Sequence, residues 1–394
     1  MRFFGGLACA VVLCASPAFA FPWMVKHGYQ SCAACHVDPS GGGQLSLYGR
    51  AQADILLRWK LNRPPPGEEQ DVAKSANFLW GLELPEALNL SGNLRGGALI
   101  PIGGTVRPIV MATDLYATFK YERFVAHVTT GLGLRNAGLG AIAPLCTATP
   151  CGPQWIAREF WAGATFADEA ILVRAGRLNV PFGLRNNEHT SWVRALTATD
   201  INLGQQYGVS ATYNSDVLRG EVMALLGNYS LGPDPYRERG YSAFMEYGFR
   251  ANFYAGLSSL VTSAQADLVT QTPVVRHAHG LTARFSPFEA LSLLAEGDLL
   301  IWQQPGTVDR IGFASWLQAD VEVVQGLHLS AALEGMHQGD GARGPSLGGW
   351  GTIAWYVLPH VEVRFDGIYR RQTAQAGQTP SNGFTLLAQV HLFL

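Results

Sequence analysis

The chain has 394 residues, of which 15% are charged, and it contains 45 glycines, 10 Trp, 13 Tyr and 19 Phe. Average soluble domains have roughly 25% charged residues, so this composition argues against an ordinary soluble enzyme. The balance of 28 basic and 30 acidic side chains excludes a strongly basic nucleic-acid-binding protein.

The first twenty residues form a predicted export signal. Arg2 gives a short positive region, residues 7–15 are apolar, and Ala18-Phe19-Ala20 fits an A-x-A cleavage site. No window after residue 20 offers 18 consecutive apolar residues, so the rest of the chain lacks the pattern of a spanning helix. We therefore expect residues 1–20 to be a signal peptide and the mature protein to be exported.

A Cys32-Ala33-Ala34-Cys35-His36 run follows the signal directly. Two thiols at this spacing add to the two vinyl groups of a haem, and the adjacent imidazole binds the iron. The alternatives are an exported disulfide or half of a zinc site, but the sequence has no second C-x-x-C. The motif predicts one covalently bound haem c, with Cys32 and Cys35 as thioether anchors and His36 as the proximal axial ligand.

The distal ligand of this haem is open. His27 and Met24 are nearest in sequence, and His189 is a distant candidate. Each of the three is equally consistent with a surface or packing role.

The rest of the haem segment is short and rich in turn formers. The glycines at 41–43 let the backbone pass close to a flat macrocycle, and residues 44–61 predict a short helix that ends before the prolines at 64–66. We assign residues 21–75 to a monohaem cytochrome c-like segment. A segment of this size is too small to bury a haem by itself, so it needs support from the remaining chain.

Residues 88–394 predict an outer-membrane β-barrel, with 76–87 as a lead-in. Apolar and polar residues alternate in runs long enough to cross a bilayer as tilted strands. In 360–370, for example, Val361, Val363 and Phe365 alternate with Glu362, Arg364 and Asp366. The fold class expected is all-β, a 16-stranded antiparallel transmembrane β-barrel with a short N-terminal c-type haem segment.

The strand count comes from the connections. Seven short turns are expected near 121–122, 168–169, 214–216, 250–251, 287–288, 324–325 and 358–359. Eight longer loops are expected near 101–107, 136–155, 179–206, 227–239, 262–276, 303–311, 338–347 and 371–383. This alternation predicts an even barrel with both chain ends on the periplasmic side. Residues 384–394 resemble the C-terminal strand by which outer-membrane barrels are recognised, although Leu394 stands where Phe is commoner.

Two loops contain candidate functional residues. Cys146 and Cys151 bracket a turn-forming stretch, and in an exported protein they predict a loop-closing disulfide. The loop at 179–206 is the third of the long loops. It is similar to the porin loop that folds into the lumen, which would make Arg185, Glu188, His189 and Arg194 pore constriction residues. A solvated surface loop is the alternative.

The C-x-x-C-H run, followed by Pro39, Leu45, Tyr48-Gly49-Arg50 and a barrel pattern, resembles the fused monohaem cytochrome c–porin family of outer-membrane electron-transfer proteins. The resemblance implies a haem in or beneath the barrel that moves electrons across the outer membrane. Ferrous iron is the donor in iron-oxidising members. The inserted residues 40–43 depart from those members, so the iron substrate stays open.

The predicted function is therefore an outer-membrane electron conduit. It implies a periplasmic electron carrier, an extracellular electron donor or acceptor, and outer-membrane lipid as partners, and no nucleic acid. Two alternatives remain: a passive diffusion porin whose haem segment is a periplasmic plug or sensor, and a haem enzyme with an open sixth coordination site.

Overall fold

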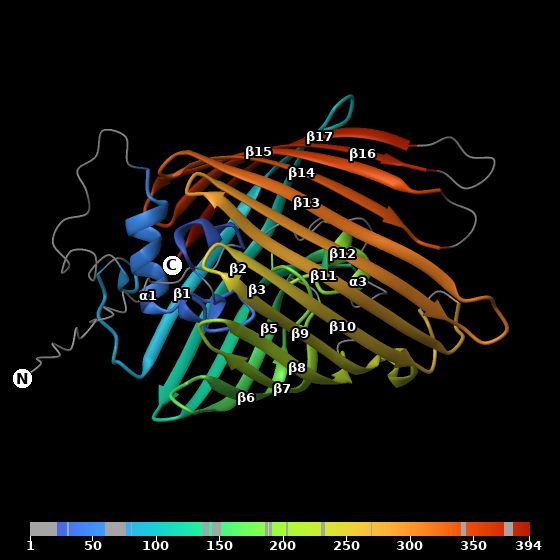
Figure 1. Cartoon of the computed structure of the whole chain (residues 1–394), viewed down its shortest axis with the longest axis horizontal. Helices are drawn as coiled ribbons and strands as arrows, with labels where there is room; N and C mark the ends of the chain where they lie inside the picture. Colours follow the sequence, from blue (N-terminus) through green and yellow to red (C-terminus); the bar gives the residue numbers. More distant parts are fainter. Residues whose placement is uncertain are drawn as a thin grey trace, which may run out of the picture.

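The structure is a computed structural model that describes residues 22–29, 31–59, 76–79, 81–136, 142–143, 151–185, 188, 191–201, 204–229, 233–268, 270–339, 344–373 and 381–394. The predicted signal peptide, Cys146 and His189 lie outside the described residues, as does the side chain of Cys151. The chain folds into a tilted, closed cylinder of strands with the N-terminal segment inside one end (Figure 1).

Sixteen long antiparallel strands form the described wall, and β1 pairs with β17 to close it. The strands are β1 (Leu88–Pro101), β2 (Arg107–Tyr121), β3 (Phe124–Asn136), β5 (Cys151–Phe166), β6 (Ile171–Leu178), β7 (Gln206–Asn214), β8 (Leu218–Gly227), β9 (Arg239–Arg250), β10 (Phe253–Ala264), β11 (Val274–Phe288), β12 (Leu291–Gln303), β13 (Arg310–Val324), β14 (Leu327–His337), β15 (Ser346–Leu358), β16 (Val361–Gln372) and β17 (Ser381–Phe393). The predicted 16-stranded antiparallel barrel is confirmed. A two-residue piece, β4 (Ile142–Ala143), pairs with β3 inside the β3–β5 connection and adds no spanning strand.

The period-two pattern determines which residues face the lumen. In β16, Glu362, Arg364 and Asp366 are buried, whereas Phe365 on the opposite face is 54% exposed. Closure pairs the backbone groups of the first strand with those of the last, so the wall has no open edge. Such a cylinder has a polar inside and an apolar outside, which suits a lipid surround.

One predicted turn is displaced. The residues Pro287 and Phe288 were expected to form a turn, but β11 continues through Phe288 and the connection falls at 289–290. The register shifts between Phe285 and Phe288, so a local irregularity accommodates the proline in the strand.

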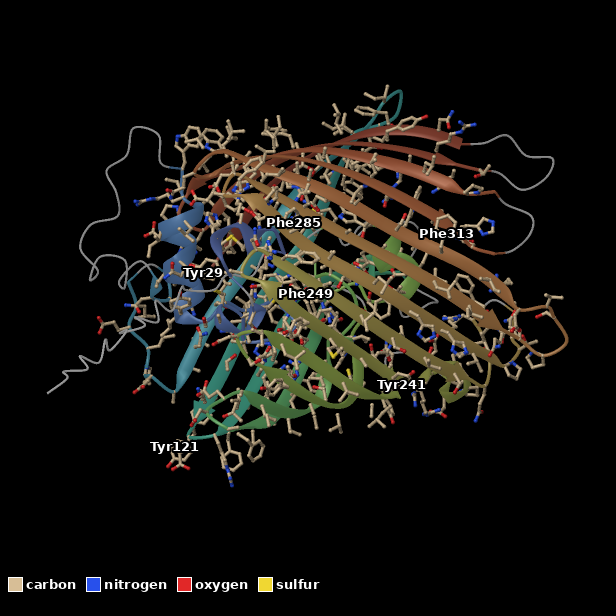
Figure 2. The ribbon with its side chains drawn as sticks, viewed as in Figure 1. Tyr29, Tyr121, Tyr241, Phe249, Phe285 and Phe313 are labelled. Atoms are coloured by element: carbon tan, nitrogen blue, oxygen red, sulfur yellow. The ribbon has the colours of Figure 1, made fainter. Side chains whose placement is uncertain are left out.

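Aromatic side chains gather at both ends of the outer face (Figure 2). Tyr121, Phe249 and Phe285 lie toward the end with the short turns, and Tyr241 and Phe313 lie toward the end with the long loops. These two belts are what a barrel presents at the two interfaces of a bilayer. We call the two ends the short-turn end and the long-loop end.

The N-terminal segment lies in the lumen near the short-turn end. It contains η1 (Pro22–His27), η2 (Cys32–Ala34), α1 (Leu47–Gln52) and a π-helical turn, η3 (Ala53–Leu57). Its hydrogen-bond and ion-pair partners come from strands on opposite sides of the wall. They include Asn89 of β1, Arg174 of β6, Arg219 of β8 and Asp320 of β13. The wall therefore surrounds the segment.

The connection between β6 and β7 also enters the lumen. Val180, Phe182 and Leu184 alternate along it and pack into three separate apolar clusters. A short helix, α3 (Trp192–Thr197), then packs against β12, β13 and β14. We call residues 179–205 the inner loop.

The lead-in to β1 forms no barrel strand in its described part. An isolated bridge joins Phe78 to Leu82, and regular pairing begins at Leu88. In the described part of the chain, no helix has the length and apolar character needed to cross a bilayer.

Candidate functional site

The cysteine motif forms a tight turn. The Ser31 hydroxyl accepts a hydrogen bond from the amide of Ala33 at 3.2 Å and caps η2. The amide of His36 donates to the carbonyl oxygen of Cys32 at 2.9 Å. Side chains three residues apart in a 3-10 turn eclipse each other, so Cys32 and Cys35 project from the same side. Both are buried free thiols.

The orientation of His36 is fixed by the loop that follows it. Its Nδ1 atom lies 2.7 Å from the carbonyl oxygen of Gly42. In the neutral imidazole this bond places the proton on Nδ1 and the lone pair on Nε2, the arrangement that metal-ligating histidines adopt. Burial lowers the pKa of His36 to about 4, against the opposing effect of the Gly42 hydrogen bond. The ring is therefore neutral at pH 7.

Glycine is required where this loop passes Cys32. Gly41 has φ +91°, and a Cβ at this position would lie 3.1 Å from Cys32 Sγ. A Cβ on Gly49 would overlap the carbonyl oxygen of Cys35, because α1 packs directly on the motif. The amide of Ser46 donates to the same oxygen at 2.8 Å. Residues 32–50 therefore form one compact unit.

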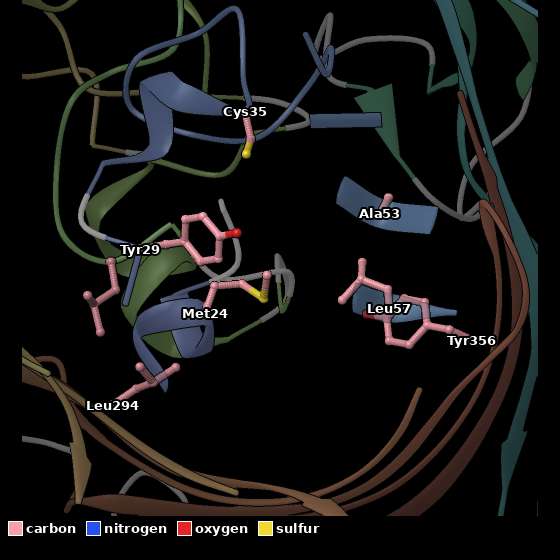
Figure 3. Close-up of a cluster of buried hydrophobic side chains, with 8 residues drawn as sticks. Met24, Tyr29, Cys35, Ala53, Leu57, Leu294 and Tyr356 are labelled. Atoms are coloured by element: carbon pink, nitrogen blue, oxygen red, sulfur yellow. The ribbon is translucent and has the colours of Figure 1, made fainter. Parts of the chain in front are cut away.

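Cys35 belongs to a buried apolar cluster (Figure 3). Met24 and Tyr29 lie on one side of it, and Ala53 and Leu57 of η3 lie on the other. The remaining buried members are Leu184, Leu294 and Tyr356. Burial raises the pKa of the Cys35 thiol, so it stays protonated at pH 7.

Cys32 has a polar environment instead. Arg219 donates from Nη1 to Cys32 Sγ at 2.8 Å, and from Nε to Glu246 at 2.6 Å. The site thus has an apolar side at Cys35 and a charged side at Cys32.

Asp38 joins the motif to the wall and to the inner loop. Arg174 donates to its Oδ1 at 2.9 Å, and the Asn179 amide donates to its Oδ2 at 3.0 Å. Burial alone would raise the pKa of this carboxyl, but the guanidinium groups of Arg174 and Arg185 hold it well below its usual range. Asp38 is therefore a buried carboxylate.

Of the three distal candidates, only two lie in the described residues. Met24 is fully buried in the cluster that contains Cys35. His27 lies outside that cluster, with Nε2 at 3.3 Å from Glu322 of β13. The structure thus places Met24, and not His27, in the same apolar cluster as Cys35.

Three of the four constriction candidates lie in the described residues, inside the barrel, and each has a different partner. Arg194 donates to the carbonyl oxygen of Phe182 at 2.9 Å and is paired with Glu296 of β12. Glu188 is paired with Arg364 of β16. Arg185 donates to the carbonyl oxygen of Val180 and lies beside Gly41. Arg185 is therefore part of the cysteine site, whereas Arg194 and Glu188 fasten the inner loop to the wall.

Sequence reasoning missed Asp38, Arg174 and Arg219 as parts of the site. The available signal was the charge of Arg174 and Arg219 on the inward faces of predicted strands. Their partners are 136 and 187 residues away, so nothing local indicated the contacts. Among the described residues, no group of three or more His, Cys, Asp or Glu is arranged to hold a metal ion.

No protein-family model and no curated protein matches the sequence. Solved outer-membrane barrels resemble the fold. OmpT of Vibrio cholerae has a TM-score of 0.60 at 10% identity over 78% of this chain and 99% of its own. The channel DcaP of Acinetobacter baumannii has a TM-score of 0.58 at 12% identity, over 78% of this chain and 97% of its own. An anion-selective porin from Comamonas acidovorans has a TM-score of 0.58 at 10% identity, over 78% of this chain and 99% of its own. At these identities the likeness establishes the porin-type barrel fold alone.

Proposed function

We propose that this chain is an outer-membrane electron conduit, with a covalently bound c-type haem held inside a porin-type barrel. The observation that carries the proposal is the position of the C-x-x-C-H motif. It lies within the lumen, with Cys32 and Cys35 as free buried thiols and His36 oriented by Gly42. The barrel fold favours the outer membrane, and the even number of strands with alternating short turns and long loops favours both chain ends in the periplasm.

The residues present fit such a haem. Cys32 and Cys35 would hold it by thioether bonds, and the free lone pair of His36 Nε2 would bind the iron. Gly41 lets the backbone pass close to Cys32, and the apolar cluster that includes Cys35 would give the macrocycle an apolar contact surface. A bound haem supplies a one-electron Fe(III)/Fe(II) couple at this position.

The chain's own residues keep this position fixed. Asp38 is held by Arg174, and Lys26 lies with Nζ at 2.9 Å from Glu322 on another side of the lumen. The Trp59 amide donates to the carbonyl oxygen of Tyr356 at 2.8 Å. A conduit needs its redox centre at a constant distance from partners on both sides, and these contacts supply that constancy.

Electron transfer across a liposome membrane tests the proposal. Purified haem-loaded protein is reconstituted around an entrapped reduced dye, and a membrane-impermeant ferric chelate is added outside. We expect reduction of the chelate, and no reduction with the matched variant Cys32→Ser/Cys35→Ser. Absence of transfer with haem shown to be present would end the conduit proposal.

A diffusion porin with a haem-bearing plug is the second candidate, because the neighbours in fold are channels and porins. The two candidates differ in ion flow. A conduit conducts electrons with its segment docked, whereas a plugged porin opens when the segment leaves. Planar-bilayer currents that appear without any electron transfer would favour the porin.

A further inference from the structure

The short-turn end of the barrel has an excess of exposed negative charge. Among the described residues, its exposed carboxylates are Glu83, Glu86, Glu122, Asp168, Glu169, Asp216 and Glu289, and its exposed cations are Lys120, Arg123 and Arg250. Among the described residues of the long-loop end, exposed Arg107 and Arg371 balance exposed Asp234 and Asp309. Within the described part of the chain, the charge asymmetry therefore belongs to the short-turn end.

The same end has exposed apolar side-chain surface on α1, the helix that packs against the cysteine motif. Leu47 is 52% exposed and Tyr48 is 37% exposed, and both lie on α1. The next residue, Gly49, packs against the backbone of Cys35. Figure 1 shows α1 at the mouth of the cylinder, at its short-turn end. Leu47 is thus an exposed apolar side chain on the helix that packs against the motif, whereas the Tyr48 hydroxyl is hydrogen-bonded to Tyr29 in the segment's interior.

We propose that this end is the docking face for a soluble electron-carrier protein with a lysine-rich surface around its redox centre. The inference rests on the proposed conduit function and names the chemistry of one partner. Leu47 would be an apolar contact, and the carboxylates would be the charged rim.

Charge complementarity selects this occupant. A ring of carboxylates attracts a cationic face, raises the rate of encounter and repels acidic proteins and nucleic acid. Small interfaces with charged rims are also typical of transient redox partners, which must separate after each transfer. The short-turn end offers this combination, whereas the balanced charges of the long-loop end do not.

Binding of a cytochrome c with a lysine-rich haem face is the test, measured by calorimetry on the full mature chain in detergent at low and high salt. We expect binding that weakens as salt rises, and no binding of the same cytochrome after its lysines are succinylated. Neutralising two carboxylates with Glu83→Gln/Glu86→Gln weakens binding about 2- to 20-fold at low salt. Leu47→Ser weakens it at every salt concentration.

The matched control is Asp234→Asn/Asp309→Asn, which removes two exposed carboxylates from the other end and leaves the affinity unchanged. Equal binding of native and succinylated cytochrome, or equal effects of the two double variants, would overturn the docking proposal. Because binding is measured without electron transfer, normal docking with no transfer across liposomes would count against the conduit alone. Transfer without salt-dependent docking would count against the docking face alone.

Discussion

Arg174 Nη2 lies 2.9 Å from Asp38 Oδ1, and both side chains are buried. The same nitrogen lies 2.9 Å from Glu221 Oε1, so one guanidinium joins the N-terminal segment to two strands of the wall. A buried carboxylate two residues after His36 is expensive to desolvate unless it is paired. The pair therefore ties the cysteine motif to one depth in the lumen.

Removing the charge of Asp38 should loosen the segment without unfolding the barrel. Asp38→Asn weakens the charge-assisted bonds to Arg174 and Asn179. Docking of the N-terminal segment against the barrel wall therefore becomes less favourable by about 2 kcal/mol. We expect backbone amides of residues 32–50 to exchange with deuterium about 10- to 100-fold faster while strand amides stay protected. Asp234→Asn, at the exposed long-loop end, is the control. Unchanged exchange in Asp38→Asn would show that the pair does not hold the segment.

Gly41→Ala should impair haem attachment through a specific contact. Its Cβ would lie 3.1 Å from Cys32 Sγ, in addition to the strain of a residue at φ +91°. Gly306→Ala shares the strain, with φ +76°, but its Cβ would have nothing within 4 Å. We expect the fraction of chains that carry covalent haem to fall several-fold only in Gly41→Ala. Similar haem fractions in the two variants would remove the role given to Gly41.

Arg194→Ala should release the inner loop. The change leaves buried Glu296 with the Leu184 amide but without its cationic partner, and it removes the bond to the carbonyl of Phe182, with a loss of stability of about 3 kcal/mol. Single-channel recordings should show larger or noisier currents. The midpoint of unfolding in urea should shift to a lower urea concentration. Arg371→Ala, an exposed position at the long-loop end, should change neither. Wild-type currents in Arg194→Ala would mean that this ion pair does not control the pore.

Met24→Ala should change the haem spectrum if Met24 is the distal ligand. Met24 is buried in the cluster with Cys35, whereas His27 is already engaged with Glu322. We expect a low-spin spectrum in the wild type and a high-spin spectrum in Met24→Ala. His27→Ala should stay low-spin. A wild-type spectrum in Met24→Ala rejects this ligand, and a high-spin wild type would favour the haem enzyme.

The barrel was predictable because each strand carries its own signal. Lipid on one side and water or charged side chains on the other impose a period of two, which Glu362, Arg364 and Asp366 display without any knowledge of their neighbours. The turn near Pro287 was misplaced because a local irregularity changes the register, and periodicity does not report it.

The interior of the barrel was predictable only in part. The C-x-x-C-H run is local, so the sequence alone predicts Cys32, Cys35 and His36 as a haem site, and this stays a prediction. The partners of this run are on strands that meet it only after the barrel closes, as with Arg219 and Cys32. That Arg185, Glu188, His189 and Arg194 constrict a pore stays a prediction. The different partners of Arg185, Glu188 and Arg194 could not be predicted, because the inner loop meets separate parts of the wall only in the folded barrel.

Covalent retention of haem tests the central claim most directly. The mature chain and the variant Cys32→Ser/Cys35→Ser are purified from the same haem-attaching host, extracted with acidic acetone, and analysed by intact mass. The account predicts that the mature chain keeps the mass of one haem and that the variant keeps none. A mature chain that loses all porphyrin on extraction would contradict it.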